Sequence, residues 1–190
     1  DVFGGDQFAY DDNTFNAIYY AVDNGAKVIN LSLGSNDKVD PQFYLDNFVT
    51  GYKKAFQYAY ENDVFIAIAS GNEGGEWDDR NKWDSVGNFD LYASSPAVFS
   101  QLFGNIASVG SSNAQNFKSS YSNYGQSISI SAPGGDGGSV MVGQDEFGTP
   151  IYEETPKTLI LSTVPVGTGN VGDRNYGYDA GTSMASPVIA

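Results

Sequence analysis

The stretch that decides the fold is Val64-Phe65-Ile66-Ala67-Ile68-Ala69. This continuous apolar run suits a β-strand that is covered on both faces, as strands are in a parallel sheet between helices. An amphipathic helix is predicted directly before it, over about residues 41–61, because aromatic and alanine residues recur there at helical spacing. A helix followed by a buried strand is the repeating unit of α/β folds.

The same unit also precedes residue 41. Apolar side chains recur on one face of a helix predicted over residues 14–24, and Gly25 is placed to end that helix. A short β-rich segment, residues 27–34, then follows as a strand. The helix–strand order therefore occurs twice, which predicts an α/β fold with a mainly parallel sheet and helices on both of its faces.

The second half of the chain carries weaker patterns. Short strands are predicted at three places: residues 105–109, 127–131 and 158–164. Residues 71–98 are typical of a loop, because glycine, aspartate and asparagine are frequent there. No internal repeat or linker composition divides the chain, so residues 1–190 are expected to belong to one domain.

Composition excludes several classes of function. The formal net charge is −14, from 23 acidic and 9 basic residues, which argues against nucleic acid or an anionic membrane as a partner. No run of about eighteen apolar residues occurs, so no membrane-spanning helix is predicted. The chain has neither cysteine nor histidine. It therefore lacks a thiol nucleophile, and a Ser-His-Asp mechanism would need its general base from outside this chain.

The sharpest motif lies near the C-terminus and reads Gly181-Thr182-Ser183-Met184-Ala185-Ser186-Pro187. A helix that begins at the serine would aim its N-terminal dipole at the hydroxyl oxygen, and Pro187 is tolerated only near the start of such a helix. Threonine and serine are also ordinary capping residues. The complete string, however, resembles the nucleophile motif of the subtilases, which are subtilisin-like serine proteases. The resemblance implies an endopeptidase that forms an acyl-enzyme on Ser183 with a polypeptide substrate.

A second segment, residues 68–74, is similar to the oxyanion-hole segment of the subtilases. The resemblance implies that the side-chain amide of Asn72 and the backbone N–H of Ser183 stabilise the developing oxyanion. An Asn-x-Gly turn is common in its own right. Its position after a buried strand and upstream of the serine motif favours the functional interpretation.

A third segment, residues 29–34, resembles the part of subtilases that lines the substrate cleft. It implies that the backbone of Ser32, Leu33 and Gly34 pairs with an extended peptide as an added strand. The same resemblance implies three residues in the wall of the pocket before the scissile bond: Ala69, Ser70 and Gly71.

The resemblance covers nearly the whole chain, apart from an apparent insertion at about residues 136–157. The Asp-Ser/Thr-Gly and His-Gly-Thr motifs that carry the catalytic Asp and His of the family are absent. The chain also stops about two turns into the predicted nucleophile helix. We therefore expect an incomplete catalytic domain that is inactive alone and needs the missing N-terminal part of the same domain.

Other interpretations stay open at this point. One is a pseudoprotease or peptide-binding module that keeps the subtilase fold. Another is the related sedolisin group, which uses serine with Glu and Asp, but its oxyanion donor is an Asp where this chain has Asn72. The subtilase resemblance also implies an extracellular, secreted protein. Structural calcium is compatible with the acidic loops, no metal ligand is assigned, and no cofactor is expected for catalysis.

Overall fold

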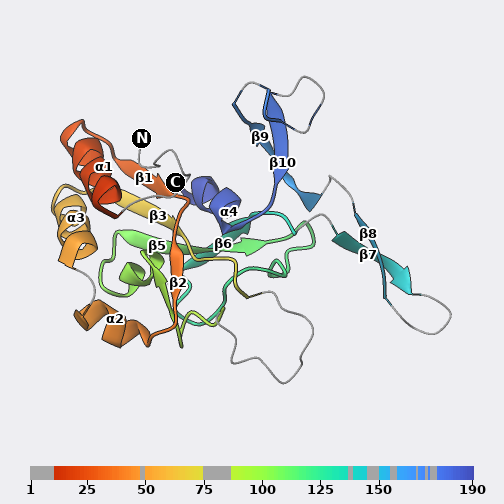
Figure 1. Cartoon of the computed structure of the whole chain (residues 1–190), viewed down its shortest axis with the longest axis horizontal. Helices are drawn as coiled ribbons and strands as arrows, with labels where there is room; N and C mark the ends of the chain where they lie inside the picture. The colour runs from red at the N-terminus through yellow and green to blue at the C-terminus, as the bar shows by residue number, and fades with distance from the viewer. Residues whose placement is uncertain are drawn as a thin grey trace.

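A four-stranded parallel sheet forms the centre of the computed structural model (Figure 1). The structure describes residues 11–47, 50–74, 87–136, 139–144, 150–154, 158–165, 167–169, 171 and 175–190. The strands are, in spatial order, β1 (Val28–Leu31), β3 (Phe65–Ala69), β5 (Ile106–Ser112) and β6 (Ile130–Pro133). Every neighbouring pair in this sheet is parallel. The predicted α/β class with a mainly parallel sheet is confirmed.

Helices cover both faces of this sheet. Helices α1 (Asp11–Asp23) and α3 (Thr50–Glu61) pack on one face, and α4 (Thr182–Ile189) packs on the other. Strand β3 serves both faces because successive side chains of a strand point in opposite directions. Ile66 and Ile68 join the core with α1 and α3, whereas Ala67 joins the core with α4.

The larger core, between the sheet and helices α1 and α3, is aromatic. Phe56 of α3 and Phe99 of the 3-10 helix η1 (Ala97–Gln101) are both fully buried, with ring centroids 5.1 Å apart. Tyr52 stacks on Phe56 at 5.5 Å. Gly51 lets α3 approach α1 closely, because a Cβ at this position would overlap the ring of Phe15.

The smaller core, under α4, consists mainly of small side chains. Its buried members come from three strands and the helix: Ala67, Ala107, Val109, Ala132 and Ala185. Small residues allow a helix to lie close to a sheet. The N-terminus of α4 is thereby brought to the carboxyl ends of the strands, where ligands bind in open α/β sheets.

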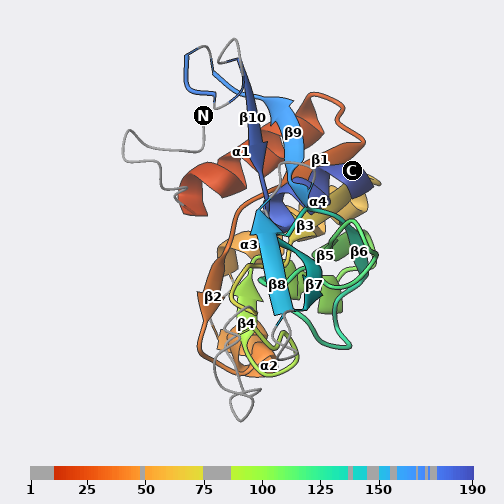
Figure 2. The ribbon, with the colours of Figure 1, turned by 90° about the vertical axis from the view of Figure 1, so that its right-hand side faces the viewer.

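Three antiparallel pairs surround the parallel sheet. Strand β2 (Ser35–Asp37) pairs with β4 (Ala93–Ser95), and β9 (Ile160–Thr163) pairs with β10 (Tyr176–Asp179). The β9–β10 pair extends beyond α4 in both Figure 1 and Figure 2. Strands β7 (Ser139–Gln144) and β8 (Pro150–Glu154) form a hairpin within the segment predicted as an insertion.

One predicted helix is two helices in the structure. The described parts of residues 41–61 form α2 (Pro41–Asn47) and α3, whose axes differ in direction, so the prediction of one continuous helix was wrong. The Asn47 side chain donates to the Phe43 carbonyl at 2.8 Å in the last turn of α2. The two helices also pack on different partners, since α3 contacts α1 and α2 contacts β4 and η1.

Strand predictions in the second half were shifted or missed. The strand predicted at residues 127–131 begins only at Ile130, because the preceding serines bond to Ser108. Ser129 N–H donates to Ser108 Oγ at 2.9 Å, and Ser108 Oγ donates to the Ser127 carbonyl at 3.1 Å. Strands β4 and β10 were not predicted, since neither shows a clear alternation of apolar and polar residues.

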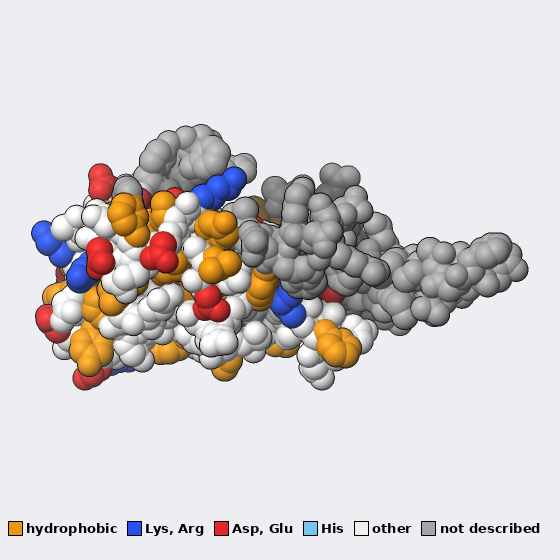
Figure 3. All heavy atoms as spheres, turned by 90° about the horizontal axis from the view of Figure 1, so that it is seen from below, with side chains coloured by type: hydrophobic (Ala, Val, Ile, Leu, Met, Phe, Trp, Pro, Cys, Tyr) orange, Lys and Arg blue, Asp and Glu red, His pale blue; other side chains and the backbone are white. Residues whose placement is uncertain are grey.

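The described surface carries mixed side chains. Acidic, basic and apolar groups are interspersed on the face shown in Figure 3. None of the helices within the described ranges has the length and hydropathy needed to span a bilayer.

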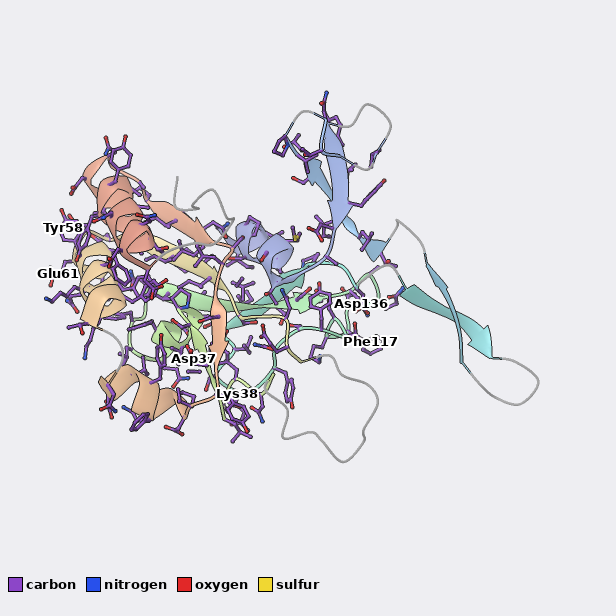
Figure 4. The ribbon with its side chains drawn as sticks, in the orientation of Figure 1. Asp37, Lys38, Tyr58, Glu61, Phe117 and Asp136 are labelled. Atoms are coloured by element: carbon purple, nitrogen blue, oxygen red, sulfur yellow. The ribbon has the colours of Figure 1, made fainter. Side chains whose placement is uncertain are left out.

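Phe56→Ala is expected to destabilise the fold strongly. Truncating a fully buried phenylalanine typically raises the free energy of the native state by about 3–5 kcal/mol. The matched control is Phe117→Ala, because Phe117 is 71% exposed and lies far from α3 (Figure 4). Urea unfolding of the full-length protein measures both, and equal midpoints for the two variants would contradict this description of the core.

Ionisation of Asp90 is expected to make the free energy of unfolding depend on pH. Burial raises the pKa of its carboxyl, but hydrogen bonds from the Ser127 side chain and from the backbone N–H groups of Gln126 and Ser127 outweigh burial and hold the pKa below the usual 3.8. The folded state therefore binds the proton less readily than the unfolded state. The stabilisation is present above the ordinary pKa and is lost as the pH falls through the lowered one.

Asp90→Asn tests this contribution. The difference in unfolding free energy between wild type and variant is expected to shrink between about pH 6 and about pH 2. A difference that stays constant over this range would show that the ionised carboxylate is not what stabilises the Gln126–Ser127 turn.

Candidate active site

Segments far apart in the chain meet at the carboxyl ends of β1 and β3. They enclose a cavity of about 180 Å³ next to the N-terminus of α4. Its lining comes from the ends of β1 and β3, from β2, β4 and α4: Leu33, Gly34, Ser35, Ala69, Gly71, Asn72, Glu73, Ser94, Thr182 and Ser183. Six of the eight predicted site residues are in this set, and the other two are Ser32 and Ser70.

Ser183 is the second residue of α4 and is half-buried at the cavity. Its backbone N–H belongs to the first turn of the helix, where amides have no intrahelical acceptor. Among the described residues its Oγ makes one long hydrogen bond, donated to the Ser32 carbonyl at 3.4 Å. The hydroxyl is therefore weakly held at a point where the helix dipole favours negative charge.

Asn72 follows β3 and is oriented by Thr182. Its Oδ1 accepts hydrogen bonds from Thr182 N–H at 2.9 Å and from Thr182 Oγ1 at 3.0 Å. These two donors assign the amide oxygen to that side, so Nδ2 is left as a donor. Nδ2 lies 3.6 Å from the position that a Cβ on Gly181, two residues before the serine, would occupy.

Asn123 fixes the residues on both sides of Asn72 through hydrogen bonds. Its buried side chain donates to the Ser70 carbonyl at 2.7 Å and to Glu73 Oε2 at 2.8 Å, and it accepts from Glu73 N–H at 3.0 Å. Its backbone N–H donates to the Gly71 carbonyl at 3.1 Å. One asparagine thus makes four hydrogen bonds to residues on both sides of Asn72.

Gly71 is required by this arrangement. Its φ of +101° is unfavourable for other residues, and a Cβ there would overlap Asn123 Nδ2 and lie 2.5 Å from Glu73 Oε2. Gly34, on the opposite wall, is similarly restricted, because a Cβ would lie 2.8 Å from the Ser95 carbonyl oxygen.

Ser32 and Ser70 stand apart from the other predicted residues. Ser32 contacts Ser183 directly, because its Oγ donates to the Ser183 carbonyl at 2.6 Å. The Ser70 side chain is fully buried and does not line the cavity, and its Oγ has no hydrogen-bond partner among the described residues. Ser70 contributes its carbonyl, which accepts from Asn123.

The wall formed by β2 and β4 is braced by Tyr44. Its hydroxyl donates to Ser95 Oγ at 2.6 Å, one residue from Ser94 in the cavity lining. Burial raises the pKa of Tyr44 above its usual 10.0, so the phenol stays protonated as a donor at neutral pH.

Several functional residues were missed by sequence reasoning. Thr182 was interpreted only as a possible cap, and Asn123 was not singled out. Glu73 is the one charged residue in the described lining of the cavity. Their places in the sequence could have pointed to two of them, because Thr182 and Glu73 each adjoin a predicted site residue.

The described residues offer no cluster of carboxylates for the calcium considered from the sequence. No group of three or more acidic side chains is placed to hold a metal ion within the described ranges. The acidic pairs at residues 78–79 and 145–146 lie outside those ranges.

Known proteins resemble this chain in sequence and in fold. Residues 1–190 match the profile Peptidase_S8, the subtilase family. The thermophilic serine proteinase of Bacillus sp. (strain AK1) is 30% identical over 92% of this chain and 29% of its own length. Thermitase of Thermoactinomyces vulgaris is 29% identical over 92% of this chain and 42% of thermitase. The crystal structure of a lanthipeptide protease matches with a TM-score of 0.69 at 27% identity, over 99% of this chain and 51% of that protein.

The chain thus spans about half or less of the length of these relatives. Relatives named as extracellular proteases and as intracellular proteases are both found. The profile match extends from the first residue to the last, and the chain belongs to the subtilase family.

Proposed function

We propose that this chain supplies the nucleophile and the oxyanion hole of a subtilisin-type serine endopeptidase. The observation that carries the proposal is the double hydrogen bond from Thr182 to Asn72 Oδ1. It leaves the amide donor of Asn72 and the Ser183 backbone N–H available beside a weakly held Ser183 hydroxyl. Together these groups form a nucleophile and an oxyanion hole, which acyl transfer through a serine uses beside a general base.

The reaction runs in two halves. Ser183 Oγ attacks the scissile carbonyl carbon while its proton passes to a general base. Asn72 Nδ2 and the Ser183 N–H donate to the oxyanion of the tetrahedral intermediate. The peptide C–N bond then breaks, the leaving amine takes the proton from the base, and an acyl-enzyme remains on Ser183. Water, activated by the same base, hydrolyses this ester and frees the serine.

The general base comes from outside these residues, because the chain contains no histidine. Strand β1 is at one end of the sheet order, and the residues after it contact Ser183 through Ser32. A cavity of about 330 Å³ runs along the described part of α1 and residues 29–33. The missing N-terminal part of the same domain would extend the sheet at this edge and bring its His and Asp to Ser183.

The substrate would be a polypeptide in extended conformation. Residues 32–34 leave the sheet after β1, and Leu33 and Gly34 line the cavity. Their backbone is suited to pair with the peptide as an added strand, with Ala69 and Gly71 as the facing wall of the pocket and Ser70 behind them. Secretion forms part of the same proposal and is supported by relatives named as extracellular.

A non-catalytic role is the second candidate, and the absence of histidine is the observation that favours it. A pseudoprotease that keeps the subtilase fold would bind peptides in the same cleft without cleaving them.

Ser183→Ala is expected to abolish labelling of the full-length protein by a fluorophosphonate probe, which forms a covalent bond to an activated serine. Ser162→Ala is the control, because Ser162 is exposed on β9 and distant in sequence from the cavity lining. This control should be labelled like wild type. Equal labelling of wild type and Ser183→Ala would refute the nucleophile, and no labelling of wild type would favour the non-catalytic role.

Asn72→Ala is expected to lower kcat by about 10²–10³ and to leave KM within about twofold. The magnitude is borrowed from subtilisin, a member of the same family, in which one oxyanion donor was removed. KM should change little because the amide acts on charge that develops only in the transition state. Asn16→Ala, on the exposed side of α1, is the control. A rise in KM with unchanged kcat would assign Asn72 to substrate binding instead.

A further inference from the structure

Pro187 leaves a gap in the hydrogen-bonding pattern of α4. The residue lies inside the helix, four positions after Ser183. In a regular α-helix the N–H of residue 187 would donate to the carbonyl of residue 183. Proline has no N–H, so the carbonyl of the nucleophile residue lacks its helical donor.

The hydroxyl of Ser32 fills this gap. It donates to the Ser183 carbonyl at 2.6 Å, a short distance for a hydrogen bond between neutral groups. The donor comes from the end of β1, so the bond joins the central sheet to the first turn of α4.

The direction of this bond is set by two further residues. Asn30 Nδ2 donates to Ser32 Oγ at 2.9 Å, so Ser32 must accept there and direct its single proton elsewhere, to Ser183. The Asn30 amide is in turn oriented by Ser186, whose buried Oγ donates to Asn30 Oδ1 at 2.7 Å. The chain of hydrogen bonds therefore starts and ends on α4 and passes through β1.

We propose that Ser32 is a positioning residue for the nucleophile, and that Pro187 makes this possible by leaving the Ser183 carbonyl free. The proposal rests on the proposed function. The side chain of Ser32 fixes the backbone of Ser183, while the backbone of the same segment is the part suited to bind the substrate. The short segment that follows β1 therefore sets the distance between substrate and nucleophile.

The position of the Ser183 backbone affects the chemical step more than it affects substrate binding. An acyl transfer depends on the placement of Oγ relative to the scissile carbonyl, and small displacements are costly. Loss of the Ser32 hydroxyl leaves the Ser183 carbonyl without a partner and free to shift. The consequence should appear in kcat, because the backbone that contacts the peptide is retained.

A double-mutant cycle between residues 32 and 187 tests the proposal in the full-length protein. Ser32→Ala is expected to slow fluorophosphonate labelling and to lower kcat by about tenfold, with KM unchanged within about twofold. Pro187→Ala supplies an N–H that can donate to the Ser183 carbonyl. In that background Ser32→Ala should cost less than about twofold.

Three further variants complete the design. Ser32→Thr keeps the hydroxyl and should retain labelling within about twofold of wild type. Asn30→Ala, which removes only the orienting amide, should slow labelling by a smaller factor than Ser32→Ala and covers the case in which Pro187→Ala fails to fold. Ser162→Ala should be unaffected.

The outcomes separate the two proposals. Equal losses for Ser32→Ala with proline or alanine at residue 187, or no loss with proline, would overturn the positioning role and leave the nucleophile intact. Wild-type protein that is not labelled at all would overturn the proposed function and the positioning role with it.

Discussion

The close packing of α4 on a sheet face made of small residues is the constraint on which the rest of the structure depends. Ala67, Ala107 and Ala132 remove side-chain volume from that face, and Ala185 removes it from the helix. The helix axis can then lie near the strands, so that the first turn of α4 is within hydrogen-bond reach of the residues that follow β1 and β3. With larger side chains at these positions, the bonds from Thr182 to Asn72 and from Ser32 to Ser183 could not form together.

The other face of the sheet has the opposite character. Large aromatic rings of α3 and η1 fill the space between the helices and the sheet, and their burial with the surrounding aliphatic side chains favours folding. Strand β3 presents large side chains, Ile66 and Ile68, to the aromatic core and a small one, Ala67, to α4. The stability of the fold and the precision of the site are therefore assigned to different faces of the same strand.

The sequence was informative where a local pattern determines the outcome. The continuous apolar run at residues 64–69 predicted a buried parallel strand, and the string around Ser183 predicted a helix start at that position. The break between α2 and α3 was not predicted, because apolar residues keep helical spacing across it while the two helices pack on different partners. The hydrogen bonds of the Thr182, Asn123 and Ser32 side chains also escaped prediction, since each joins residues that are 50 or more positions apart.

The four hydrogen bonds of Asn123 have a consequence for how this site can change over evolution. At this position the side chain must donate two hydrogen bonds and accept one at a fixed distance from the backbone. Among the side chains only asparagine can do this. Aspartate would bring a second carboxylate against Glu73, and glutamine is one methylene too long. The conformation of residues 70–73 therefore depends in part on Asn123, which does not line the cavity. Homologues whose cleft carries other side chains but keeps the same backbone geometry are expected to differ at Glu73 more often than at Asn123.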